Sequence, residues 1–458
     1  MSTDAPLPRK IAFGWATGEV GIAAYIGITM SYMLYYLTEA QGIAPALAGF
    51  ALLVPRMWDA VIDPFVGAIS DRTRSRMGRR RPYLLIGGIS FGLLFSLIFQ
   101  LPVTLSPMIK VGILVALYMV TSTAFTFYDV AFSSMAAEMT ADYRARTLLV
   151  GYKMIAARAG IVLAVIAAPL FFASGPTLAA GFANMGLAAG VLMIGTGLWS
   201  FFSTRAAPQI TRPIEHFSLK LEYEALKQNR PFLILWLVFL CQNIAVGATA
   251  TLQIYLVIFV MKVDPKLVGA MVAISAISAM LATPLWIRLA RRYGKRPIYF
   301  VSMSMAVLFT LPVLFLPAGW PVALFTLFLL AGIGDAATQL CPNAMVPDTV
   351  EYDEARTGER REGAIFGTWL LARKFGMATG AFVISLFLSF FGFQSGADAT
   401  GQSDTALLGI RLAYTLVPGS MWLLGMFVLR YYRLDEDQFN ALRRQMADDR
   451  AERKAEPD

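Results

Sequence analysis

The sequence is poor in the residues from which most enzymes and metal centres are built. Its 458 residues include one histidine and two cysteines, and only 15% carry a charge. His216 stands alone in a polar stretch, which leaves zinc coordination and histidine-based catalysis without the groups they need. Cys241 and Cys341 lie inside apolar runs, so we interpret both as free thiols of the core. We expect no cofactor and no enzymatic activity.

We also expect no cleavable signal peptide, because residues 1–9 are polar and the first apolar run is too long for one. Apolar residues, in contrast, are abundant and make up 57% of the chain. A chain of this length cannot hide that much apolar surface from water, so the lipid bilayer must be its solvent. The runs are long and continuous, which indicates helices, since backbone groups in lipid must bond within their own segment.

Twelve runs are long enough to cross the hydrocarbon. The predicted spans are 11–38, 47–70, 82–102, 108–137, 147–173, 178–202, 231–260, 267–290, 297–317, 321–347, 361–393 and 406–432. Lys and Arg concentrate in alternate loops, after the second, fourth, sixth, eighth and tenth spans. Cytoplasmic loops carry such an excess, so both termini are predicted to face the cytoplasm of a multi-pass inner-membrane protein. The net charge of +9 then reflects topology, and we expect no nucleic-acid partner.

The polar stretch 203–230 divides six spans from six. We predict an N-terminal bundle over 1–202, a cytoplasmic linker over 203–230, a C-terminal bundle over 231–432 and a charged cytoplasmic tail over 433–458. A glycine with basic residues precedes Pro82 in the first half and Pro297 in the second, and a carboxylate closes the fourth span of each half. Parallel repeats of this kind predict an all-α major facilitator fold.

Two aspartates, Asp59 and Asp63, lie four residues apart near the middle of the second span, and Arg56 precedes them on the same helix face. A charge at that depth is costly unless it is paired or faces a cavity, so an intramembrane carboxylate pair predicts function. Two neighbouring carboxylates resist joint ionisation, which suits uptake and release of a proton or a sodium ion. The alternative is a structural role, in which Arg56 merely neutralises one aspartate.

Further charges lie at similar depth in other spans. Asp129 is in the fourth span and Lys374 in the eleventh, and a lysine among aspartates can replace the cation when the site is empty. Glu19, Arg158 and Asp335 are also deep enough to be candidates.

The sequence resembles the glycoside–pentoside–hexuronide:cation symporter family. The resemblance is carried by the segment from Arg56 to Pro64, by the basic segment from Asp71 to Pro82, and by the segment from Val346 to Tyr352 with Lys374. It covers both halves, from about residue 11 to residue 433.

The resemblance implies a secondary transporter with a defined cation site. It implies that Asp59, Asp63, Thr126 and Asp129 bind the coupling cation, with Asp129 between cation and sugar, and that Lys374 and Arg56 take part in coupling. At the position before the second aspartate the family's best-known member has an asparagine, whereas this chain has Ile62. Loss of an oxygen ligand weakens a sodium site more than a protonatable pair, so protons are our first choice and sodium the second.

The substrate pocket is less well predicted, because the sugar-binding residues of that relative align here with Ala23, Ser133 and Gln339. Our candidate substrate residues are Tyr25, Asp129, Lys153, Arg158, Gln339, Asn343, Trp369 and Lys374. A sugar or glycoside is the expected cargo, and a lysolipid or another amphipathic solute is the alternative. We expect a monomer that works by alternating access.

The basic loop between the second and third spans also suggests a cytoplasmic gate, in which its arginines pair with acidic helix ends. The candidates are Asp71, Arg72, Arg76, Arg79, Glu138, Asp348 and Glu351. The alternative is that these charges only orient the protein. Two competing functions are a membrane-embedded prenyltransferase, whose Asp-x-x-x-Asp spacing Asp59 and Asp63 match, and a non-transporting sensor. The first lacks a second acidic motif within the membrane, and neither explains the internal repeat.

Overall fold

Helices account for the regular structure of the described part of the chain. The computed structural model describes residues 8–140, 143–172, 174–207, 227, 229–357, 361–397 and 401–434, and within these ranges it contains no strand. The first half comprises α1 Arg9–Ala16, α2 Gly18–Tyr35, α3 Pro45–Arg72, α4 Arg81–Ile98, α5 Pro107–Glu138, α6 Tyr143–Phe172 and α7 Leu178–Ser203. The second comprises α9 Arg230–Tyr255, α10 Lys266–Tyr293, α11 Lys295–Thr310, α12 Pro321–Thr357, α13 Glu362–Phe390 and α14 Asp404–Leu429.

Twelve of these helical segments are long and apolar enough to cross a membrane, and each overlaps one predicted span. The predicted all-α fold with twelve spans is therefore confirmed. Several helices begin with a proline in the first turn, where its missing N–H leaves no hydrogen bond unmade, as in α3, α4 and α5. Others begin with a capping side chain: Asn229 accepts from the Phe232 N–H at the start of α9.

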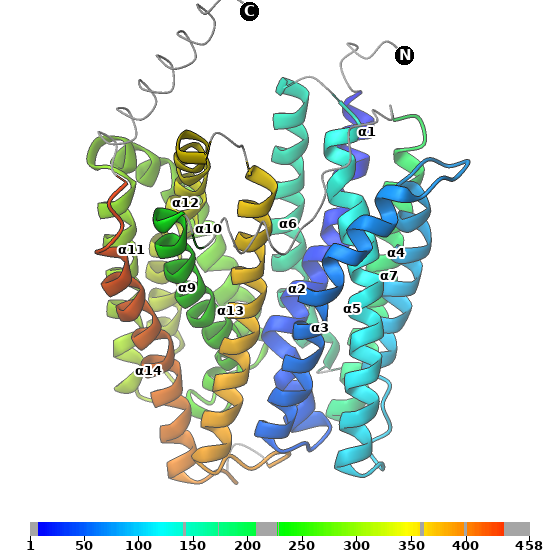
Figure 1. Ribbon diagram of the computed structural model, residues 1–458. Helices are drawn as coiled ribbons and strands as arrows, with labels where there is room; N and C mark the ends of the chain where they lie inside the picture. The colour runs from blue at the N-terminus through cyan, green and yellow to red at the C-terminus, as the bar shows by residue number, and fades with distance from the viewer. Residues whose placement is uncertain are drawn as a thin grey trace, which may run out of the picture.

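The helices pack as two bundles that lie side by side (Figure 1). In the first, α2 packs on α6, α3 on α5, and α4 on both α5 and α7. In the second, α9 packs on α13 and α14, and α12 on α10 and α11. The bundles meet mainly through three pairs, α3 with α13, α6 with α10, and α2 with α9. The boundaries predicted at 202, 230 and 432 stay predictions, since most of the linker and almost all of the tail lie outside the described residues.

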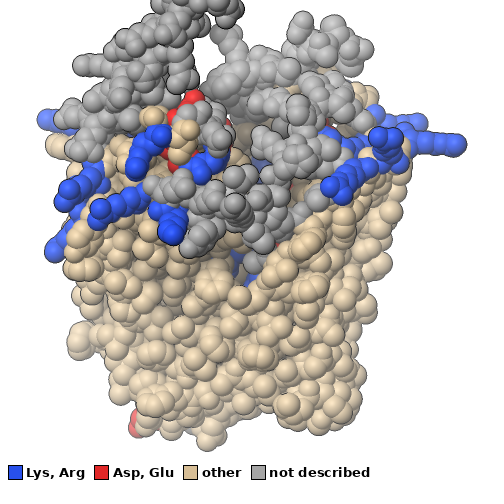
Figure 2. Space-filling model, in the orientation of Figure 1, with Lys and Arg blue, Asp and Glu red and all other residues tan. Residues whose placement is uncertain are grey.

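One end of the molecule is strongly basic, and we call it the basic end. Lys and Arg gather at this end on the face seen in Figure 2. The first helix begins there and α14 ends there (Figure 1). Placement of the basic end in the cytoplasm remains the inference drawn from the sequence.

Two hydrogen bonds join the bundles at the opposite end. The helices α2 and α9 each finish there in a π-helical turn, Tyr36–Ala40 and Leu256–Val260. The Thr38 hydroxyl in the first turn lies 2.7 Å from the hydroxyl of Tyr255, next to the second turn. Ser395 donates to the Ile43 carbonyl at 2.9 Å nearby. The two bundles are therefore joined at the end away from the basic residues.

Candidate functional site

The two aspartates of α3 face α5 in the middle of the molecule. Asp59 is fully buried, and its Oδ1 accepts hydrogen bonds from the hydroxyls of Ser122 and Thr126, both at 2.9 Å. The Thr126 hydroxyl also lies 3.1 Å from Oδ1 of Asp63. One turn of helix separates the two carboxylates, and one turn separates the two hydroxyls, so the pairs match in register. The result is a cluster of four oxygen-bearing side chains between two helices.

Lys374 of α13 reaches this cluster from the second bundle. Its Nζ lies 2.5 Å from Oδ2 of Asp63 and 3.0 Å from Oδ2 of Asp59. Its side chain is only 14% exposed, so water screens the ion pairs weakly. The ammonium thus bridges both carboxylates, and it does so across the boundary between the bundles. We call Asp59, Asp63, Ser122, Thr126 and Lys374 the bridging cluster.

Arg56 supports the bridging cluster from the same helix. Its guanidinium lies over the rings of Tyr25 and Tyr118, with centroid distances of 5.6 and 5.9 Å. It is also close enough to Asp59 for the opposite charges to attract. The side chains of Asp59, Asp63, Lys374 and Arg56 together contain two negative and two positive groups.

Asp129 belongs to a second polar group on the first bundle. Its Oδ1 lies 3.4 Å from the hydroxyl of Ser133, which accepts a hydrogen bond from Lys153 at 2.8 Å. Lys153 is also 3.5 Å from Oε2 of Glu19. We call Glu19, Asp129, Ser133 and Lys153 the α5–α6 polar chain. Asp129 also interacts electrostatically with Lys374, so it is the member of the α5–α6 polar chain that connects this chain to the bridging cluster.

The second bundle contributes a polar group of its own. Trp369 donates to Oδ1 of Asn343 at 3.3 Å, and Asn343 donates to the Gln339 carbonyl at 2.7 Å. The Trp369 ring is stacked on Phe239, with centroids 3.8 Å apart. Arg158 is exposed on α6 and interacts electrostatically with Asp335 of α12, across the bundle boundary.

Tyr25 differs from the prediction of a pocket-lining residue. It is 0% exposed and is enclosed by Phe91, Phe95 and Phe125, whose ring centroids lie 4.7 to 5.4 Å away. Its ring fills the interior of the first bundle and supports Arg56. Tyr25 therefore packs in the core of the first bundle, because its neighbours are the aromatic rings of two residues of α4 and one of α5.

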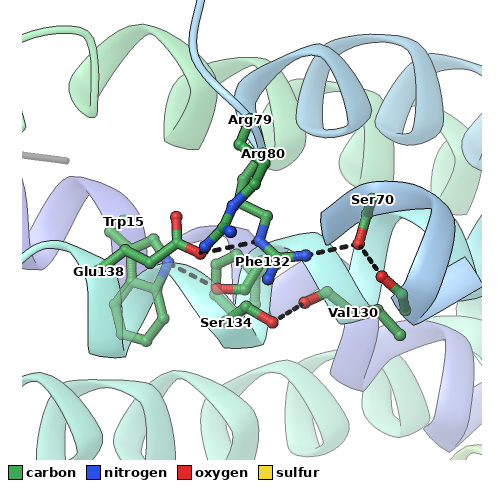
Figure 3. Close-up of polar contacts among 9 residues, drawn as sticks. Trp15, Ser70, Arg79, Arg80, Val130, Phe132, Ser134 and Glu138 are labelled. Carbon is green, nitrogen blue, oxygen red and sulfur yellow. Dashed lines mark hydrogen bonds and ion pairs between the residues drawn. The ribbon is translucent and has the colours of Figure 1, made fainter. Parts of the chain in front are cut away.

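The basic end of the first bundle carries a compact ion-pair group (Figure 3). Arg79 and Arg80 donate to the same oxygen of Glu138, at 2.7 and 2.9 Å, and Arg80 also donates to the Ser70 hydroxyl. Beside it, the Trp15 indole donates to the Phe132 carbonyl at 3.2 Å. These contacts tie the loop after α3 to the ends of α3 and α5.

The predicted gate is matched only in part. Glu138 does pair with Arg79, but Asp348 pairs with Lys295 of its own bundle, at 2.6 Å, rather than with the basic loop of the other bundle. Arg72 and Arg76 are exposed. Glu351 lies near the end of α12, and the side chain of Asp71 lies outside the described residues. The pairs Arg79–Glu138 and Lys295–Asp348 each lie within one bundle.

Sequence reasoning missed Ser122 and Arg373, and it named Ser133 only as the residue that aligns with a sugar-binding position of the relative. Ser122 lies one turn before Thr126 on α5, and a helical-face argument from Thr126 could have found it. Arg373 precedes Lys374 and interacts electrostatically with Glu19, which links α13 to the α5–α6 polar chain. A serine in an apolar helix carries no signal by itself, since it can also bond to its own backbone.

Comparison with known proteins agrees with this architecture. Residues 14–436 match the family described as MFS/sugar transport protein. The chain is 28% identical to the putative glycoside/cation symporter YagG of Escherichia coli, with 97% of this chain and 96% of the relative covered. It is also 28% identical to the glucuronide carrier protein homolog of Escherichia coli, with 95% of each chain covered.

Among solved structures, the crystal structure of the nucleoside transporter NupG is similar in fold, with a TM-score of 0.66 at 13% identity over 93% of this chain and 100% of that one. That similarity shows the major facilitator architecture. The family match covers nearly the whole chain and consists of transporters and not enzymes. The chain is a multi-pass membrane transporter that belongs to the MFS/sugar transport family, in its glycoside–pentoside–hexuronide:cation symporter group.

Proposed function

We propose that this chain is a monomeric inner-membrane symporter that uses protons to drive uptake of a sugar or glycoside. The observation that carries the proposal is the Lys374 bridge between Asp59 and Asp63, because it connects the two bundles at the carboxylate pair. A coupling site needs this property: its occupancy must change how the two halves interact.

In the proposed mechanism, Lys374 replaces the coupling cation in the state described, since its ammonium pairs with both aspartates. With both aspartates ionised, its ammonium and Arg56 balance the two negative charges. A proton on one aspartate removes one attraction and weakens the hold on Lys374. The freed ammonium can then turn toward Asp129, which already attracts it. Cation binding would thereby reorganise the side chains that face the substrate.

The geometry at Thr126 favours a proton. Its hydroxyl has one hydrogen but lies within 3.1 Å of two carboxylate oxygens, on Asp59 and Asp63. One of these two contacts therefore has no hydrogen while both aspartates are ionised. A proton on Asp63 would supply it and turn an oxygen–oxygen repulsion into a hydrogen bond. Ile62 adds no oxygen for a sodium ion, although Ser122 offers one more hydroxyl.

The α5–α6 polar chain supports a sugar as cargo. Carboxylates at Glu19 and Asp129 accept hydrogen bonds from hydroxyl groups, and Lys153 donates them. Across the boundary, Trp369 and Asn343 add an aromatic ring and an amide. Relatives named as a glycoside/cation symporter and an isoprimeverose transporter are consistent with this class of substrate.

Alternating access follows from where the bundles touch. The Thr38–Tyr255 and Ser395–Ile43 contacts close the end opposite the basic residues. At the basic end, Arg79 pairs with Glu138 in the first bundle and Lys295 pairs with Asp348 in the second. In the proposed mechanism, rocking of the bundles opens the basic end while the contacts between the bundles hold the other end closed, and the reverse motion follows.

The proposal is tested by uptake into proteoliposomes. Sugars, glycosides and lysolipids are offered under an imposed proton gradient or an imposed sodium gradient. We expect a proton gradient to drive accumulation of a sugar or glycoside. The Asp63→Asn variant should lose accumulation, and Asp264→Asn, a change in the exposed loop before α10, serves as the matched control.

Accumulation driven by sodium alone would overturn the choice of cation. Movement of lysolipids alone would overturn the choice of cargo. Full accumulation by Asp63→Asn would overturn the role of the bridging cluster.

A further inference from the structure

The second bundle contains a partly open cavity that the proposed coupling mechanism does not use. Its volume is about 230 Å³, and residues of α9, α10, α11, α12 and α14 line it, together with Val313 just beyond α11. The end nearer α12's start is mainly apolar, with Leu324, Leu327 and Phe328, and its polar groups are Gln253 of α9 and Thr310 of α11. Asp335 and Thr338 lie farther along the same helix. The cavity thus runs from a mainly apolar end to a polar end at Asp335 and Thr338.

The corresponding space in the first bundle is filled. Tyr25, Phe91, Phe95 and Phe125 form an aromatic cluster there, with ring centroids between 4.7 and 5.4 Å apart in each contacting pair. Since the two bundles are sequence repeats, these positions can be matched by counting from shared anchors.

The first anchor is the proline at the start of α4 and of α11, Pro82 and Pro297. Nine residues after each proline are Phe91 and Ala306. Thirteen residues after each are Phe95 and Thr310. Both residues of the second bundle line the cavity.

The second anchor is the carboxylate that pairs with the basic loop, Glu138 in α5 and Asp348 in α12. Thirteen residues before each are Phe125 and Asp335. At each of these three matched positions a phenylalanine of the first bundle is replaced by a smaller or polar residue that lines the cavity. The cavity therefore arises from substitution at the repeat positions that fill the first bundle.

A cavity of this kind is costly unless something fills it, because its lining loses packing contacts. Gln253 also lines it, is 6% exposed, and its Nε2 has no hydrogen-bond partner in the described part of the chain. A buried donor without a partner is uncommon in proteins and indicates a missing ligand or solvent. Asp335 keeps one carboxylate oxygen free of the Thr338 and Gln339 contacts, which both go to Oδ1.

The polar end of the cavity faces the boundary between the bundles. Asp335 interacts electrostatically with Arg158, which belongs to α6 of the first bundle. Its repeat counterpart, Phe125, lies one turn before Asp129 on α5. Asp335 is therefore at nearly the depth of the α5–α6 polar chain, and the apolar end extends from there toward the closed end of the molecule.

We propose that this cavity receives the aglycone of a glycoside substrate, an apolar or aromatic group. The proposal rests on the proposed function, in which the sugar ring binds at the α5–α6 polar chain. Phe309, Phe328, Tyr414 and Trp422 provide aromatic contacts for the group. Asp335 and Gln253 accept and donate hydrogen bonds along its length. The volume of about 230 Å³ has room for a small aglycone.

The test compares aglycones of increasing size. Free glucose, xylose and glucuronate, and their methyl, propyl and phenyl glycosides, are offered to the wild-type chain and to Ala306→Phe, which introduces the ring present at the matched position of the first bundle. Leu308→Phe, at a position on α11 that is 59% exposed, is the control. We expect phenyl glycosides to bind about tenfold more tightly than methyl glycosides to the wild type, because more apolar area is buried. Ala306→Phe should abolish that gain and keep methyl glycoside uptake, whereas Leu308→Phe should keep both.

Equal phenyl-to-methyl ratios in wild type and Ala306→Phe would overturn the inference while the transport proposal stands. If the wild type accumulates no sugar at all, the transport proposal fails, and thermal unfolding still decides the cavity. Phenyl glycosides must then raise the unfolding temperature of the wild type and not of Ala306→Phe. Thr310→Phe, matched to Phe95, provides a second filled variant should Ala306→Phe fold poorly.

Discussion

In the first bundle, Arg80 donates to Glu138 and Arg81 donates to the Phe201 carbonyl at the end of α7. In the second, Lys295 donates to Asp348 and Arg296 to the Arg430 carbonyl at the end of α14. The same two contacts, at matched positions before a proline, tie together the basic end of each bundle. Both bundles therefore share these two stabilising contacts at the basic end.

The interiors of the bundles differ. The first has the carboxylate pair on α3 and a core packed with aromatic rings, whereas the second has Lys374 and a cavity. The proposed roles place different demands on a bundle, since a cation site needs fixed oxygens and a cargo site needs space. The comparison indicates that the first bundle supplies a tightly packed core around the carboxylate pair, whereas the second supplies space.

The largest effect should come from Lys374→Met, which removes the group that joins the two bundles at the cation site. Two carboxylates would then remain close together in a poorly screened region. Breaking a buried ion pair costs about 3–5 kcal/mol, so we expect driven accumulation to fall at least about 100-fold. Proteoliposome uptake measures this, with Lys266→Met as an exposed control. Accumulation within twofold of the wild type would mean that the bridge has no part in coupling.

The next largest effect should come from Phe125→Asp, which gives the first bundle the residue found at the matched position of the second. It removes a buried ring that contacts Tyr25 and Phe91 and introduces a charge without a partner. We expect a loss of about 3–5 kcal/mol in stability. Thermal unfolding in detergent checks it, and the reciprocal Asp335→Phe should be tolerated far better. An equal loss of stability in both variants would show that the two interiors do not differ in how tightly they are packed.

Glu138→Gln should have an intermediate effect. The change leaves Arg79 and Arg80 without their carboxylate, and the Arg80 side chain is only 8% exposed. We expect a loss of about 1–3 kcal/mol, since hydrogen bonds to charged groups are worth about that much. Chemical unfolding of the purified protein, compared with Glu138→Asp, measures the loss. An unchanged midpoint of unfolding would mean that the ion pairs of Glu138 do not stabilise the fold and that the arginines only orient the protein in the membrane.

The matching change in the second bundle, Asp348→Asn, should have the smallest effect. Its partner Lys295 is 40% exposed and also donates to the Ala344 carbonyl, which the substitution leaves in place. Exposed ion pairs contribute about 0–1 kcal/mol, so the shift should stay below that of Glu138→Gln. The same unfolding measurement applies. A larger loss than in Glu138→Gln would reverse the order of the two anchors.

The twelve spans could be predicted because lipid imposes one length and one composition on every crossing helix. Helix ends were less predictable. The tenth predicted span ends at 347, whereas α12 continues to Thr357, since its last turns are polar and held by contacts at the basic end. Apolar length cannot reveal a helix that leaves the membrane and goes on.

The carboxylate pair could be placed on one face from its spacing alone, and Lys374 from its depth and the family resemblance. Ser122 and the filled environment of Tyr25 could not be predicted, because they depend on which helices become neighbours. The spacing of residues within one helix predicts which side chains share a face, but it does not predict which side chains of a neighbouring helix contact that face.

The balance of charge around Lys374 has a consequence for how the membrane potential acts on the carrier. The two aspartates, the lysine and Arg56 sum to zero, so the empty protein carries no net charge from these groups as it reorients. In the proposed mechanism a bound proton adds one elementary charge, and moving one charge through the full field yields about 2.3 kcal/mol per 100 mV. The voltage would thus accelerate the loaded step and leave the return step nearly untouched. Because Lys374 is part of the chain and cannot dissociate, its charge stays with the aspartates when the carrier is empty, and the proposed voltage dependence is confined to the loaded step.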